Sequence, residues 1–234
     1  MRTLPLAAAL ALVAAPAVQA QGLPMPKGVQ RTYTAGTRTL DGTPGPNYWT
    51  NHARYKVSIS TTPPDPRVTG TEELTYTNES PDTLRTLVIR LFPNSHKPGA
   101  PRLGGASTDE LTSGVHVTAF SVNGTAQPWQ ESGRYFTWQP VRLPAALAPH
   151  QSVTLSFDWW FDLPARPGRY GVIDSTTFYV AYFYPRVAVY DDYNGWDTMD
   201  HTSHEFYSDF NDYDVTVTVP ANYVVWGTGT LTNA

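Results

Sequence analysis

The chain has 234 residues and a formal net charge of −4, from 16 Lys and Arg against 20 Asp and Glu. This balance, without any basic cluster, excludes a nucleic-acid-binding protein, because phosphates demand a basic face. The absence of cysteine excludes disulfides and thiolate metal sites. The 21 prolines and 17 glycines favour many short strands joined by turns.

Residues 1–20 have the pattern of a secretory signal peptide. Arg2 precedes an Ala/Leu/Val core, and a small-x-small ending closes at Ala20. The apolar run is too short, and too broken by Pro5 and Pro16, to span a bilayer, and nothing later resembles a membrane span. We therefore expect an exported protein, periplasmic or extracellular, without a membrane span.

Residues 21–47 are rich in Gly, Pro and Thr without sustained periodicity, and we expect an extended lead-in segment. One β-domain, residues 48–234, is expected to follow. Alternating apolar and polar residues, or dense apolar runs, predict strands at 55–59, 68–78, 84–92, 115–122, 134–138, 153–159, 178–189, 213–219 and 223–226.

Three details refine this pattern. The run at 84–92 is densest in apolar residues and should be more fully buried, and a long polar loop, 93–113, follows it. Asn123-Gly124 predicts a tight hairpin. No stretch of twelve or more residues after the signal peptide shows a helical period. The predicted fold is all-β, antiparallel and two-layered.

The sequence His201-Thr202-Ser203-His204-Glu205 has the residue types of a zinc site but not the spacing. A zincin needs His-Glu-x-x-His on a helix, so that both imidazoles lie one turn apart, and the inverted motif also fails. We interpret these residues as part of a loop or an edge, and we expect no metal site in this chain.

The acidic loop at 191–197 raises the question of calcium. An EF-hand frame with Gly195 at position six places Tyr190 and His201 at positions that require carboxylates, which excludes it. Two interpretations stay open. One is a turn whose carboxylates bond nearby backbone N–H groups; the other is an irregular calcium site formed by Asp191, Asp192, Asp197 and Asp200.

Catalytic motifs are absent: there is no Gly-x-Ser-x-Gly and no cysteine nucleophile, and we expect no catalytic residue in this chain. Paired carboxylates for glycoside hydrolysis stay open, since their spacing is spatial. The aromatic residues are dense enough to imply a core or an interface. They include Trp129, Trp138, Trp159, Trp160, Tyr182, Phe183, Tyr184 and Trp196. A free-standing secreted module that binds carbohydrate or peptide on an aromatic face is therefore one hypothesis.

The other hypothesis comes from a resemblance. The sequences YFYPRVAVYDDYNGW and HEFYSDFNDYDVTVTVP, with WTNHARYKVSI, VTGTEELTYTNESPDTLRTLVIRLFPN and YVVWGTGTL, resemble the N-terminal β-domain of family M1 zinc metallopeptidases. The similarity is greatest to the exported bacterial branch. It implies a saddle-like β-sandwich beside a separate catalytic domain, where His-Glu-x-x-His and a later Glu hold zinc.

That motif is not in this chain, so the resemblance implies a non-catalytic scaffold and cleft domain that lacks its catalytic partner. Zinc and peptide hydrolysis would then belong to the full-length enzyme, and this chain alone would hold no cofactor. A domain without its partner should expose a sheet edge or an apolar patch near the C-terminus and tend to self-associate.

The resemblance also implies candidate site residues. In the family, a Gln or Glu four or five residues before an Arg binds the free amine of the peptide substrate; here Ala181 and Tyr182 stand before Arg186. This departure puts the amine contact in doubt. Tyr182 and Tyr184 are the candidates for lining the pocket rim, unless alternate residues of this strand are simply core.

Arg186 is the single cation in an acidic neighbourhood. We expect it to pair with Asp191 or Asp192 and to hold the shape of the loop, since an Arg–carboxylate fork is geometrically specific. Arg186, Asp191 and Asp192 are therefore candidates for a structural role.

Overall fold

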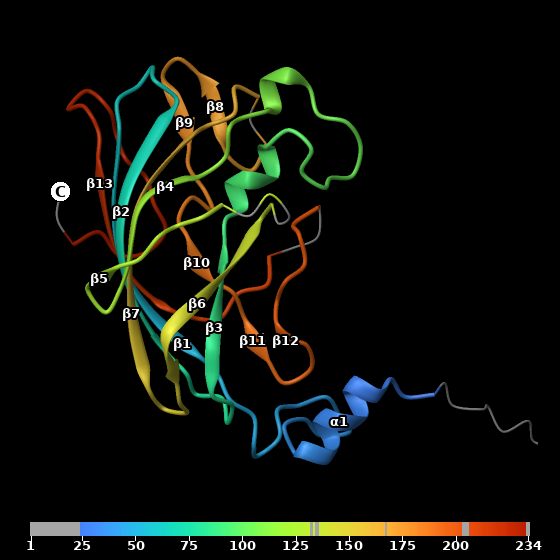
Figure 1. The fold of residues 1–234 in the computed structure, drawn as a ribbon. Helices are drawn as coiled ribbons and strands as arrows, with labels where there is room; N and C mark the ends of the chain where they lie inside the picture. The colour runs from blue at the N-terminus through green and yellow to red at the C-terminus, as the bar shows by residue number, and fades with distance from the viewer. Residues whose placement is uncertain (1–23, 132, 134–135, 167, 203–205, 233–234) are drawn as a thin grey trace, which may run out of the picture.

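The computed structural model describes residues 24–131, 133, 136–166, 168–202 and 206–232, and Figure 1 shows their arrangement. The helical elements are α1 (Lys27–Ala35) and the short 3₁₀ helices η1 (Phe92–His96) and η2 (Thr108–Glu110). The strands are β1 (His52–Thr61), β2 (Arg67–Thr77), β3 (Leu84–Arg90), β4 (His116–Val122), β5 (Thr125–Ala126), β6 (Trp138–Leu147), β7 (Ser152–Asp162), β8 (Gly171–Asp174), β9 (Thr177–Tyr179), β10 (Arg186–Val187), β11 (Tyr190–Asp191), β12 (Gly195–Trp196) and β13 (Asp212–Thr218).

The larger layer is a six-stranded sheet in the order β13-β1-β2-β7-β4-β5. Its long strands bury alternate residues, as a sheet with one face on a core must. The register places Tyr55, Leu74 and Leu155 side by side on the inner face. One pair departs from the antiparallel prediction, because β13 runs parallel to β1.

The smaller layer is a three-stranded sheet in the order β10-β3-β6. Its central strand buries Leu87, Val88, Ile89 and Arg90 in succession, so both of its faces are covered. This confirms the prediction that the run at 84–92 is more fully buried than the others.

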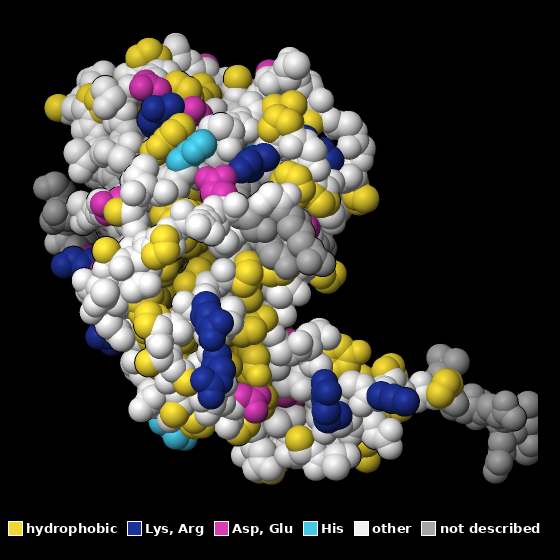
Figure 2. Space-filling model, in the orientation of Figure 1, with side chains coloured by type: hydrophobic (Ala, Val, Ile, Leu, Met, Phe, Trp, Pro, Cys, Tyr) yellow, Lys and Arg dark blue, Asp and Glu magenta, His cyan; other side chains and the backbone are white. Residues whose placement is uncertain are grey.

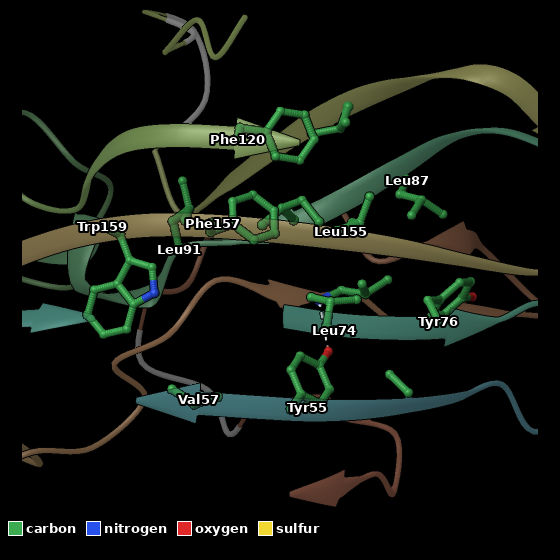
Figure 3. Packing of buried hydrophobic residues seen from close by; sticks show 14 of the residues in the cluster. Tyr55, Val57, Leu74, Tyr76, Leu87, Leu91, Phe120, Leu155, Phe157 and Trp159 are labelled. Carbon is green, nitrogen blue, oxygen red and sulfur yellow. Dashed lines mark hydrogen bonds between the residues drawn. The ribbon is translucent and has the colours of Figure 1, made fainter. Parts of the chain in front are cut away.

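Among the described residues, one hydrophobic cluster joins the two layers. Figure 3 shows Tyr55, Leu74 and Leu155 of the larger sheet in the same cluster as Leu87 of β3. The two-layer, sandwich-like all-β fold is thus confirmed, and its stability comes from apolar burial between the sheets.

Most predicted strands are present with shifted ends, namely those at 55–59, 68–78, 84–92, 115–122, 153–159 and 213–219. Asn123 (φ 48°) and Gly124 (φ 75°) form the predicted hairpin between β4 and β5. The strand predicted at 223–226 is wrong, since these residues lie in no strand.

The strand predicted at 134–138 is displaced. Residues 134 and 135 lie outside the described residues, and β6 instead begins at Trp138 and continues to Leu147. It passes through Pro140 and Pro144, which argue against a strand in the sequence. An edge strand tolerates prolines, because half of its N–H groups need no ladder partner.

The prediction of an extended lead-in is wrong for residues 27–35, which form α1. Gly36 ends the helix with φ 70°. A nine-residue helix is marginal by itself, and contacts with the β11–β12 hairpin support it: Arg31 Nη2 donates to the Tyr193 carbonyl over 2.8 Å. Figure 1 shows α1 at the end of the molecule where this hairpin lies.

None of the helices in the described part of the chain is long and apolar enough to cross a bilayer. The expected signal peptide, residues 1–20, lies outside the described residues.

Candidate functional site

The segment between β9 and β10 carries both tyrosines singled out by the sequence. The continuous strand predicted over 178–189 is wrong, since residues 180–185 are irregular. Tyr182 has φ 53°, in the left-handed region that residues with a Cβ rarely adopt. Pro185 has no N–H to donate to a ladder. These two residues interrupt the strand beside a pocket.

The pocket has a volume of about 280 Å³. Its aromatic lining comes from four separate parts of the chain: Phe92, Tyr170, Tyr182 and Phe206. His96 also lines it; burial lowers the pKa of this imidazole, so His96 is neutral at pH 7.

Three of these rings form a continuous wall. The ring centroids of Tyr182 and Phe206 are 3.8 Å apart, those of Phe92 and Phe206 4.3 Å, and those of Phe92 and Tyr182 6.2 Å. Tyr182, predicted at a pocket rim, thus lies in the lining of a pocket.

Tyr184 lies elsewhere. Its ring packs against Tyr55 and Tyr213, at centroid distances of 5.5 and 5.7 Å, and its hydroxyl donates to the Tyr213 hydroxyl over 2.9 Å. It is not among the residues that line this pocket. The structure therefore separates the two tyrosines, one on the pocket and one against β1 and β13.

Arg186 holds a different segment from the one expected. It lies opposite Arg90 in the β10–β3 register, and both are buried. Arg186 Nη1 donates to Ser208 Oγ over 2.6 Å, and Nη2 donates to the Tyr207 carbonyl. The expected pairing with Asp191 or Asp192 is not found among the ion pairs of the described residues.

Asp209 lies in the same neighbourhood. Burial raises its pKa to about 6, although the positive charge of Arg186 opposes the shift. This carboxyl therefore takes up a proton not far below neutral pH.

Asp191 caps the turn of the β11–β12 hairpin. Its Oδ1 accepts hydrogen bonds from the N–H groups of Tyr193 and Asn194, at 3.0 and 2.6 Å. Gly195 completes the turn with φ 73°. The interpretation of this loop as a turn held by carboxylate-to-backbone bonds is confirmed for Asp191.

Asp192 binds the lead-in segment. Its buried carboxylate accepts from Arg38 Nη2 over 2.7 Å and from Thr37 Oγ1 over 2.6 Å. Burial acts to raise the pKa of Asp192, but the hydrogen bonds from Arg38 and Thr37 outweigh it and the pKa is lowered. Asp192 therefore stays ionised and fixes the lead-in to the hairpin.

The other two aspartates of the calcium hypothesis have separate partners. Asp197 lies 3.7 Å from Arg90 Nη1, and Asp200 accepts from the backbone N–H and the hydroxyl of Thr137. Within the described ranges, no group of three or more His, Asp or Glu side chains is arranged to hold a metal.

The resemblance implies zinc in a separate catalytic domain, and of the three zinc-ligand residue types at 201–205 only His201 lies among the described residues. His204 and Glu205 lie outside them. His201 stacks on Phe206, with ring centroids 4.3 Å apart.

Two of the tryptophans singled out by the sequence, Trp129 and Trp160, pack against neighbouring side chains. Trp129 packs edge-on against Phe120 and Phe157 at 5.5 and 5.7 Å. On the outer face of the larger sheet, His116 stacks on Trp160 at 4.0 Å and the Arg67 guanidinium lies 3.9 Å from the same ring. Neighbouring side chains thus take up ring surface of Trp129 and Trp160 that a sugar would need.

Sequence reasoning missed most of the pocket. Phe92, Tyr170 and Phe206 are separated from each other by long stretches of chain. Phe92 was assigned to the end of a strand, and the other two drew no prediction. No local pattern marks them, because ring contacts between distant residues bring them together: Phe92 of η1 contacts Phe206, and His96 of η1 contacts Tyr170.

An exposed apolar surface lies near the C-terminus, as expected. All residues of β13 are exposed, including Val215 at 46% and Val217 at 37%. Trp226 is 93% exposed. Figure 2 shows a second feature, a hollow on the right side of the molecule between the loops at the top and α1 at the bottom.

No protein-family model and no curated protein matches this chain. Solved structures of M1 zinc metallopeptidases are similar to part of it. For a mutant of the enzyme from Deinococcus radiodurans, the identity is 20% and the TM-score 0.42, over 76% of this chain and 34% of that chain.

For a mutant of the Deinococcus radiodurans enzyme bound to a Tyr-Ser-Ala substrate, the identity is 18% and the TM-score 0.44, over 82% of this chain and 38% of that chain. For a two-domain mutant bound to L-arginine, the values are 19% and 0.42, over 76% and 35%. The chain spans little more than a third of the length of these structures.

Proposed function

We propose that this chain is the N-terminal β-domain of an exported M1-like zinc metallopeptidase, and that it forms one wall of the peptide cleft without supplying catalytic residues. The sequence resemblance supports this proposal over most of the chain after residue 48. The zinc-binding motif and peptide hydrolysis would belong to a separate catalytic domain of the same enzyme.

One observation carries the proposal. One of the segments that carry the resemblance, residues 182–196, contributes Tyr182 to an aromatic pocket and then forms a hairpin, β11–β12. The carboxylate of Asp191 accepts a hydrogen bond within the hairpin turn, and that of Asp192 accepts one from Arg38. Both carboxylates therefore stabilise the conformation of the segment. These contacts support a structural role for the segment, as one wall of the peptide cleft.

Tyr182 is then the residue that faces peptide substrate. Tyr184 donates a hydrogen bond to the Tyr213 hydroxyl and so attaches the same segment to β13. Arg186 anchors the segment through Ser208, while Asp191 and Asp192 keep the hairpin closed and attached to the lead-in.

Activity and metal content of two proteins test the proposal. The purified chain should neither hydrolyse aminoacyl anilides nor bind zinc one-to-one. The product of the native gene, read beyond Ala234 to its stop codon, should contain His-Glu-x-x-His and do both.

A variant of the gene product with the motif Glu changed to Gln is the control; it should keep zinc and lose hydrolysis. A stop codon directly after Ala234, or stoichiometric zinc with hydrolysis by the chain alone, would refute the proposal.

A further inference from the structure

Three aromatic rings in mutual contact form one wall of the pocket at Tyr182. Tyr182, Phe92 and Phe206 lie within 3.8 to 6.2 Å of each other, centroid to centroid. The Tyr182–Phe206 pair is tilted by 32°, and the Phe92–Phe206 pair is edge-on at 82°. Such a wall offers both ring faces and ring edges to a ligand, which is the arrangement that another aromatic ring prefers.

The backbone at this wall is strained. Tyr182 adopts φ 53°, a conformation unfavourable for a residue with a bulky side chain. Strain of this kind persists only where the surroundings impose it, and it clusters at binding sites. It is an observation independent of the pocket itself, and it points to the same residue.

Two buried arginines hold the other side of the wall. Arg90 Nη1 donates to the Met199 carbonyl over 2.6 Å, and Arg186 Nη1 donates to Ser208 Oγ over 2.6 Å. They thus hold the chain at Met199 and at Ser208, two residues after Phe206. The wall is therefore preorganised, which lowers the cost of ordering it around a ligand.

Charged side chains in and beside the pocket bear on the charge of the ligand. Arg102 and Arg169 line it with one carboxylate, Glu110, which already lies 3.6 Å from Arg166. The guanidinium carbons of Arg90 and Arg186 lie 5.0 and 4.8 Å from the Phe92 ring centroid, and that of Arg169 lies 5.8 Å from the Phe206 centroid. These cations already interact with the ring quadrupoles that would attract a ligand ammonium. A neutral ring suits the pocket better than an amine.

We propose that this pocket binds the aromatic side chain of a peptide, and that Tyr182 and Phe206 determine the specificity. That the ligand is a peptide rests on the proposed function, whereas the preference for a neutral aromatic ring rests on the pocket alone. The volume of about 280 Å³ admits one such ring.

Binding of small probes to the purified chain tests the proposal without any hydrolysis. The probes are phenol, cyclohexanol and phenethylamine, titrated while the amide resonances of Phe92 and Phe206 are followed by NMR. Phenol should bind about threefold or more tighter than cyclohexanol, the size expected for one aromatic pair. Phenethylamine should bind no better than cyclohexanol.

Tyr182→Ala and Phe206→Leu should each weaken phenol binding about three- to tenfold. Tyr179→Ala is the matched control, because its ring is 52% exposed on β9 and does not line the pocket; it should change nothing. Phe206→Leu is close to volume-conserving and decides the outcome should Tyr182→Ala not fold.

Equal binding of phenol and cyclohexanol overturns the proposal. So does phenol binding that leaves the Phe206 resonance unmoved, or that neither variant weakens. Each of these results would leave the proposed cleft function intact, since they concern only what the pocket accepts.

Discussion

Glu72 is the residue whose chemistry fits its surroundings least. It lies on the inner face of β2, only 3% exposed, between Gly70 and Leu74. Neither of its carboxyl oxygens has a hydrogen-bond partner among the described residues. Burial raises the pKa of Glu72 well above its usual range, and it also raises the pKa values of the neighbouring Tyr55 and Tyr184. Burial therefore favours the neutral, protonated form of all three groups.

This burial predicts a pH dependence of stability. Because the pKa in the folded state lies above the unfolded value of about 4.3, the stability linked to Glu72 is complete below pH 4.3 and is lost as the pH rises toward the folded pKa. Glu72→Gln should therefore raise the melting temperature at pH 8, with a gain that shrinks toward pH 4. Thermal unfolding over this range measures it.

Glu73→Gln is the control, since Glu73 points to the exposed face of the same strand. A gain of equal size at pH 4 and pH 8, or an equal gain from Glu73→Gln, would contradict the linkage.

At the scale of elements, β2 and β7 are fitted to each other by one glycine. Gly70 lies opposite Trp159, the largest of the fully buried side chains. A Cβ at position 70 would overlap the indole ring. Glycine weakens a strand by itself, so its presence here is explained by the space that the indole takes.

Gly70→Ala should therefore destabilise the fold by about 1–3 kcal/mol, the usual cost of overpacking a core. Thr71→Ala, on the exposed face of β2, should change stability by no more than about 0.5 kcal/mol. Denaturant unfolding of both variants is the measurement. Trp159→Phe should recover part of the loss caused by Gly70→Ala in a double-mutant cycle; additive effects would show that the two residues do not interact.

The attachment of α1 is another property of elements. The Arg38–Asp192 pair, at 2.7 Å, joins the lead-in to the β11–β12 hairpin across 154 positions of sequence. The position of α1 thus depends on a long-range contact that the local sequence does not predict.

At the scale of the whole molecule, the larger sheet ends in β13, whose residues are all exposed in the described structure, although Tyr213 stacks on Tyr55 at 5.0 Å. Val215 and Val217 of β13 pair with Val57 and Ile59 of β1, yet only the β1 residues are buried. The core face of the sheet therefore continues past the part that the smaller sheet covers. Exposed edges of this kind promote association with other strands.

We expect the purified chain to self-associate as its concentration rises. Val217→Lys should reduce this association, because a lysine on an edge strand blocks pairing. Thr216→Lys, on the opposite face of β13, adds the same charge and should have a smaller effect. Light scattering coupled to size exclusion measures the mass; a monomer at all concentrations would contradict the expectation.

The sequence by itself determined the two-layer β-architecture. The alternation in β1, β2 and β7 and the dense run of β3 suffice for it, because a period of two places every second residue on one face. The Asn123-Gly124 turn was equally predictable from the sequence, since its backbone conformation is a local property of those two residues.

Only the tertiary structure decided the break of the strand at Tyr182, the helix at 27–35, and the pocket of Phe92, Tyr170, Tyr182 and Phe206. It also decided that Arg186 binds Ser208 and that Asp192 pairs with Arg38. The physical reason is the same in each case. These features depend on contacts between distant segments, whose free energy outweighs the local preferences that a sequence pattern expresses.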